Sequence, residues 1–138
     1  MSATPTSSPT RPGLRAAPVL LWFGVLGGAA AWTAHTLVDW SIDETTCRAG
    51  ATDLAGVPMK PVLIGSTLLF LLVSAVATVV AWRQWHVLRA AEGEDPLSQL
   101  RLQRAGFMAL VGFAADVVFT LILVCTAIAV FVFPVCGA

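Results

Sequence analysis

The sequence has 138 residues, of which 57% are hydrophobic and only 12% are charged, and its formal net charge at pH 7 is zero. This composition excludes an ordinary soluble domain and predicts an all-α membrane protein. It also excludes a nucleic-acid partner, because the chain has no basic patch that could neutralise phosphates.

The amino-terminal segment is rich in Ser, Thr and Pro and has little apolar surface to bury, so residues 1–15 are predicted to form a disordered tail. The apolar run that follows is too long for the core of a secretory signal, and it is predicted to be an uncleaved membrane span at about 17–38. Within it, Gly24, Gly28 and Ala31 form a stripe of small residues that lets another helix approach closely. A coding bias toward small residues is the alternative explanation of this stripe.

Two more spans are predicted, at about 61–83 and 105–133, because both stretches are long and apolar enough to cross a bilayer. Residues 39–60 are predicted to form a polar loop between the first two spans. A turn is predicted at 92–96 in the second connector. Residues 16–138 should therefore form one three-helix transmembrane domain.

The placement of the basic residues predicts the orientation of these spans. Six of the eight Lys and Arg residues lie in the tail or the second connector, whereas Arg48 and Lys60 lie in the first connector. By the positive-inside rule, the amino terminus and the second connector are predicted to be cytoplasmic. The loop between the first two spans and the carboxyl terminus are then outside.

The three cysteines differ in their predicted positions. Cys47 and Cys136 are both expected on the outer, oxidising side, and a disulfide between them is predicted. Such a bond would close a loop of about ninety residues and stabilise the fold by about 4 kcal/mol. The alternative is two free thiols that bind copper or exchange with a redox partner. Cys125 lies inside the third span and is expected to be a packing residue.

Asp116 is the one acidic residue in the third apolar run and is expected near the bilayer midplane. Because an ionised carboxylate there costs at least roughly 2.5 to 3.5 kcal/mol, we expect Asp116 to be protonated or turned toward the other helices. Ser74 and Thr120 are expected at similar depth, and a hydrogen bond from a neutral carboxyl to Ser74 would fasten two helices. Proton transfer or contact with a partner protein is the functional alternative.

Trp32, His35 and Asp39 are spaced by three and four residues, which places them on one helix face near the outer interface. This polar ridge suits contact with a quinone head group or a partner protein, whereas a hydrogen bond of His35 to Asp39 or water is the purely structural explanation. His86 is expected roughly 30 Å away, near the inner surface. The two histidines therefore cannot share a haem, and no metal or cofactor is predicted.

Several short motifs occur at or near the ends of the predicted spans, namely AAAWTAH at 29–35, DW at 39–40, Cys47, AWRQW at 81–85 and FPVC at 133–136. They resemble those of a family of small, functionally uncharacterised three-span bacterial membrane proteins, often encoded near genes for haem-copper cytochrome c oxidases. The resemblance implies three spans, an outer cysteine pair and a place in the bacterial cytoplasmic membrane. It also implies association with a respiratory oxidase as an accessory or assembly subunit.

The function predicted from the sequence is therefore that of a non-catalytic subunit whose partners are the lipid bilayer and larger membrane subunits. No Ser/His/Asp arrangement, phosphate-binding loop or His-rich metal set is present, so an enzyme is not expected. The alternative is a small homo-oligomeric channel or transporter in which Asp116 from several copies lines a pore. The resemblance gives Asp116 no role, because a small or hydroxyl residue is expected at that position.

Overall fold

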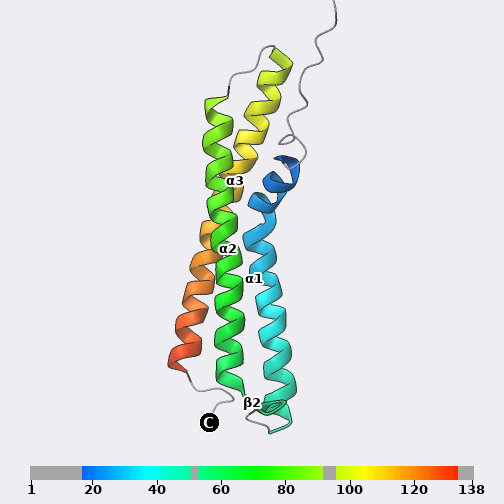
Figure 1. Cartoon of the computed structure of the whole chain (residues 1–138), viewed down its shortest axis with the longest axis vertical. Helices are drawn as coiled ribbons and strands as arrows, with labels where there is room; N and C mark the ends of the chain where they lie inside the picture. Colours follow the sequence, from blue (N-terminus) through cyan, green and yellow to red (C-terminus); the bar gives the residue numbers. More distant parts are fainter. Residues whose placement is uncertain (1–16, 51–52, 92–95, 134–138) are drawn as a thin grey trace, which may run out of the picture.

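The structure is a computed structural model, and it describes residues 17–50, 53–91 and 96–133. The described residues form three long helices and a short β-hairpin (Figure 1). Each helix is long and apolar enough to cross a membrane. The predicted disordered tail, residues 1–15, lies outside the described residues.

The elements follow one another as α1 (Ala17–Arg48), β1 (Asp53–Leu54), β2 (Val57–Pro58), α2 (Met59–Ala90) and α3 (Pro96–Val132). Figure 1 shows an elongated bundle with the hairpin between α1 and α2 at one end and the end of α2 and the start of α3 at the other. We call these the hairpin end and the connector end. All three pairs of helices contact one another, and α1 and α3 share the smallest contact.

The helices are longer than the predicted spans, and the predicted loop at 39–60 is wrong over most of its length. α1 continues to Arg48, and α3 begins at Pro96 rather than near residue 105. The last turns of α1 are polar but remain helical, and an exposed ion pair of 2.8 Å between Glu44 and Arg48, one turn apart, adds modestly to their stability. Hydropathy identifies only the apolar part of a helix, so it does not predict the polar turns by which α1 and α3 extend beyond the membrane spans.

The β-hairpin makes the tight reversal from α1 into α2. Ala55 and Gly56 at its tip both have positive φ angles, of 51° and 83°, as a type I′ turn requires. The backbone N–H of Gly56 also donates a hydrogen bond of 3.1 Å to Oδ2 of Asp53. This turn brings the end of α1 next to the start of α2.

Small residues dominate the contacts between the helices. A Cβ added to Gly24 would lie 3.1 Å from the backbone of Ala81, and one added to Gly27 would lie 2.6 Å from Cβ of Ala77. Such short separations let helix backbones approach closely, as is common in membrane bundles. The predicted small-residue stripe therefore packs against helices of its own chain. The buried hydrophobic residues are Ala31, Met59, Leu63, Ala77, Ala81, Ala109 and Leu123.

The outward faces of the bundle are apolar, as expected for contact with lipid. Trp22 and Trp40 are 55% and 64% exposed and lie toward opposite ends of α1. Tryptophan is enriched at membrane–water interfaces, and these two side chains fit such anchoring positions.

Candidate functional site

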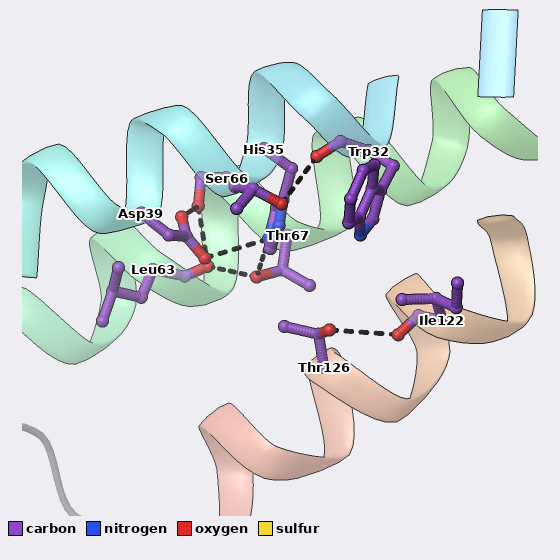
Figure 2. Close-up of polar contacts among 9 residues, drawn as sticks. Trp32, His35, Asp39, Leu63, Ser66, Thr67, Ile122 and Thr126 are labelled. Carbon is purple, nitrogen blue, oxygen red and sulfur yellow. Dashed lines mark hydrogen bonds and ion pairs between the residues drawn. The ribbon is translucent and has the colours of Figure 1, made fainter. Parts of the chain in front are cut away.

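A cluster of polar side chains joins α1 to α2 in the half of the bundle nearer the hairpin. It consists of His35 and Asp39 from α1 and Ser66 and Thr67 from α2, and we call it the His35 cluster. Figure 2 shows these side chains directed toward one another between the two helices. His35 is only 3% exposed, so its ring is almost completely shielded from solvent and lipid.

The imidazole of His35 has two oxygen partners on the same nitrogen. Its Nε2 lies 3.0 Å from Oδ2 of Asp39 and 3.0 Å from Oγ1 of Thr67. The Thr67 hydroxyl already donates to the carbonyl of Leu63 at 2.7 Å, so its oxygen is left to accept. Nε2 must therefore carry a hydrogen, which a carboxylate and a hydroxyl oxygen share. The edge of the ring also packs against Phe70, with centroids 5.8 Å apart.

The second oxygen of Asp39 is also occupied. The hydroxyl of Ser66 donates to Oδ1 of Asp39 at 2.8 Å, so this carboxylate is held by both α1 and α2. The sequence predicted that His35 and Asp39 share a face, and the structure brings them into contact. Ser66 and Thr67 were not singled out from the sequence. The sequence did contain a signal for them, because their two hydroxyl groups interrupt the apolar run of α2 at the level in the membrane where His35 is expected.

A groove opens beside the His35 cluster and extends to α3. Its volume is about 420 Å³, and it is lined by His35, Thr36, Asp39, Trp40, Asp43, Leu63 and Thr126. We call it the hairpin-end groove. Figure 2 shows Thr126 on α3 facing the cluster, with its hydroxyl bonded to the carbonyl of Ile122 on its own helix at 3.0 Å. The groove thus combines carboxylates, hydroxyls and an exposed indole on a surface that is otherwise apolar.

Trp32 does not belong to the polar ridge predicted from its spacing. Its ring packs on Phe119 of α3, with centroids 5.5 Å apart, and it therefore helps to hold α1 against α3. Its backbone carbonyl accepts a hydrogen bond of 2.9 Å from the hydroxyl of Thr36.

Asp116 lies in the middle of the bundle and is completely buried. Its Oδ1 accepts a hydrogen bond of 2.9 Å from the backbone N–H of Gly28 on α1. Its Oδ2 is buried and has no hydrogen-bond partner among the residues that the structure describes. Asp116 is thus turned away from lipid, as expected, but its partner is the backbone of α1 and not the predicted Ser74.

The hydroxyl of Ser74 has a different partner. It lies 2.8 Å from Oγ1 of Thr120, which in turn lies 3.3 Å from Oγ1 of Thr78. These three hydroxyls join α2 to α3, whereas Asp116 joins α3 to α1. Both contacts fasten helices, but through separate groups.

Close backbone approach makes the contact of Asp116 with Gly28 feasible. A Cβ added to Gly28 would meet Oδ1 of Asp116, and one added to Gly112, one turn earlier on α3, would lie 2.7 Å from the carbonyl oxygen of Gly24. Any larger residue at Gly28 or Gly112 would push α1 and α3 apart. The sequence indicated the glycines of α1 but not Gly112, because a single glycine in an apolar run carries little information.

The predicted disulfide between Cys47 and Cys136 stays a prediction, because Cys136 lies outside the described residues. Cys47 is in the last turn of α1, with its Sγ 3.1 Å from Oδ1 of Asp43. Cys125 is a free thiol exposed on α3. Within residues 17–50, 53–91 and 96–133, no group of three or more His, Cys, Asp or Glu side chains could hold a metal ion.

Comparisons with protein-family models, with curated proteins and with solved structures found nothing that matches this chain. Its structural class is therefore assigned from the length and hydropathy of its own helices. By length and hydropathy, all three suit a multi-pass helical membrane protein.

Proposed function

We propose that the protein is a non-catalytic accessory or assembly subunit of a respiratory membrane complex, with the hairpin-end groove as its contact with a larger subunit. A haem-copper cytochrome c oxidase is the complex that the motif resemblance implies. The observation that carries the proposal is the groove itself. The carboxylate and hydroxyl oxygens that line it retain acceptor capacity that lipid chains cannot satisfy, which favours contact with hydrogen-bond donors of another subunit.

The charge distribution supports an orientation with the hairpin end outside a bacterial cytoplasmic membrane. Four arginines of the described residues lie toward the connector end, whereas only Arg48 and Lys60 lie at the hairpin end. Basic residues are concentrated on the cytoplasmic side of membrane proteins. In this orientation the groove faces the compartment in which the outer domains of respiratory complexes lie.

The burial of Asp116 supports an accessory subunit over a homo-oligomeric channel. A pore between copies would need Asp116 on an outward face of the bundle. The carboxyl group is instead enclosed between α1 and α3, where Gly28 occupies one of its oxygens. A pore lined by Asp116 would require α1 and α3 to separate.

The proposal is tested by purifying the tagged protein from its own membrane in mild detergent and identifying the co-purifying proteins by mass spectrometry. We expect oxidase subunits in near-stoichiometric amount. Thr126→Leu should fill the groove, and Trp40→Ala should remove its indole wall. Each should lower the yield of oxidase subunits by about tenfold, which corresponds to a loss of about 1.4 kcal/mol.

Two control variants match these substitutions outside the groove. Thr33 is exposed on α1, and its hydroxyl bonds to the carbonyl of Ala29 at 2.8 Å, so Thr33→Leu matches Thr126→Leu. Trp22→Ala matches Trp40→Ala at the other end of α1. Wild-type protein that co-purifies with no respiratory subunit would refute the proposed function. Oxidase retained equally by all four variants would show that the groove is not the contact.

A further inference from the structure

A second cleft lies between α2 and α3 at the connector end, far from the His35 cluster. Its volume is about 310 Å³. Its apolar wall includes Leu88 on α2 and Phe107 on α3, and Arg89 and Gln103 also line it. A Cβ added to Gly106 would lie 3.9 Å from Cβ of Leu88, so the absence of a side chain there keeps the cleft open. The cleft is amphipathic, with a charged group beside an apolar wall.

Arg89 is the one charged group that lines this cleft among the residues that the structure describes. Its guanidinium carbon lies 5.4 Å from the centre of the Trp85 ring, which is within the range of a cation–π contact. No carboxylate in the described part of the chain lies within ion-pair distance of Arg89. The indole therefore holds the guanidinium at the cleft, where no carboxylate of the described residues competes with an anion for its N–H groups.

The position along α2 matches the depth of lipid phosphates. Trp82 and Trp85 form an aromatic cluster near the end of α2, with ring centroids 5.3 Å apart, and such residues are typical of the membrane–water interface. Arg89 lies one turn beyond Trp85, which is a rise of about 6 Å. A guanidinium just outside an aromatic belt is at the level of the phosphate groups, and the apolar wall of the cleft is at the level of the upper acyl chains.

The surrounding charge favours an anion. Arg83 on α2 and two further arginines on α3, Arg101 and Arg104, lie at the same end, and none of them has an ion pair with a described carboxylate. Three acidic residues occur in the connecting segment at 92–95, outside the described residues, and they leave the stretch from Arg83 to Arg104 with a net positive charge.

We propose that this cleft is a binding site for an anionic phospholipid. Arg89 binds the phosphate by charge-assisted hydrogen bonds, and the apolar wall takes the beginning of an acyl chain. Basic pockets between transmembrane helices are known to bind anionic head groups, and a phospholipid is the anion that the bilayer presents at this depth. The inference does not depend on which protein covers the hairpin-end groove.

The test is native mass spectrometry of the purified protein with dioleoyl phosphatidylglycerol and, separately, dioleoyl phosphatidylcholine. We expect phosphatidylglycerol to be retained preferentially. Arg89→Gln should weaken its retention about fivefold, as expected for about 1 kcal/mol per basic residue near a membrane surface. Gly106→Leu should weaken it similarly by filling the cleft while leaving every charge in place.

The matched control is Arg83→Gln, which removes another exposed arginine of α2 that does not line the cleft. It should leave retention unchanged, and Arg89→Lys should keep most of it.

An equal loss in Arg83→Gln would overturn the site, because general surface charge would then explain binding. Equal retention of phosphatidylcholine, or displacement of the lipid by millimolar glycerol phosphate, would also overturn it. Arg89→Gln remains decisive if Gly106→Leu does not fold, because Arg89 is exposed and far from the bundle core.

Discussion

The contact between Gly28 and Asp116 and the His35 cluster are both polar features inside an apolar bundle, but they are built differently. The first has a single carboxyl group enclosed by close-packed backbone, with no opening to the surface. The second has four side chains that satisfy one another and lies beside a groove of about 420 Å³. One contact is therefore closed, and the other borders a surface that another molecule can reach.

The comparison distinguishes a polar group that only holds helices together, Asp116, from a polar cluster that another molecule can contact. Asp116 uses one oxygen to accept from the backbone N–H of Gly28, which it reaches because the glycine lets α3 approach α1 closely. Asp39 is held by His35 and Ser66 and is still partly exposed to the groove. An intramembrane acid is by default a candidate for function, but here the acid at the bilayer edge is the better candidate.

The largest effect is expected from Cys47→Ser at the hairpin end. If Cys47 pairs with Cys136, its loss should lower the free energy of unfolding by about 4 kcal/mol, because the bond closes a long loop in the unfolded chain. The measurement is unfolding in mixed micelles with increasing dodecyl sulfate. Cys125→Ser is the control, since Cys125 is a free, exposed thiol. Alkylation of both Cys47 and Cys136 under non-reducing conditions would contradict the disulfide.

The next largest effect is expected from Gly112→Ala in the closed contact. The added methyl group would lie 2.7 Å from the Gly24 carbonyl oxygen and 2.8 Å from Cα of Val25, so α1 and α3 must separate. Overpacking of this kind costs about 1 to 3 kcal/mol. Gly65→Ala is the control, because nothing lies within 4 Å of a Cβ there. The same unfolding assay applies, and equal stability of the two variants would rule out the close approach.

A smaller effect is expected when Asp116 itself is changed. Asp116→Ala removes the acceptor for the Gly28 N–H and should cost about 1 to 2 kcal/mol, the range found for hydrogen bonds between membrane helices in model systems. Asp116→Asn keeps an oxygen for that N–H and should cost less. Unfolding of both variants gives the comparison. A larger loss for Asn than for Ala would show that the hydrogen bond to Gly28 does not carry the stability.

The smallest effect is expected from Thr67→Val in the His35 cluster. The methyl group replaces a hydroxyl that accepts from Nε2 of His35, but Asp39 remains as a second acceptor for the same hydrogen. We therefore expect a loss of about 0.5 to 1 kcal/mol. Combining Thr67→Val with Asp39→Ala, which leaves Nε2 of His35 with neither acceptor, should cost more than the sum of the two single changes, and strict additivity would contradict shared acceptance.

The three long helices could be predicted from the sequence because apolar runs of sufficient length leave no other fold in lipid. Their ends could not, since the turns of α1 up to Arg48 are stabilised by local contacts and not by hydropathy. The contact between His35 and Asp39 followed from their spacing on one helix. The partner of Asp116 did not follow, because it is a backbone N–H inside α1, and such a group ordinarily donates only to the carbonyl four residues earlier. Ser74 offered a visible side chain at the right depth, yet it pairs with Thr120.

The length of α3 has a consequence for how the protein can be reached from outside the lipid. Its 37 residues rise about 55 Å, whereas the hydrocarbon layer is about 30 Å thick. With its most apolar stretch in the bilayer, the first turns of α3 after Pro96 extend beyond the hydrocarbon layer, through the head-group level at which the proposed lipid site lies. A cross-linker or antibody fragment directed at the start of α3 would report on neighbouring subunits in intact membranes without entering the hydrocarbon layer.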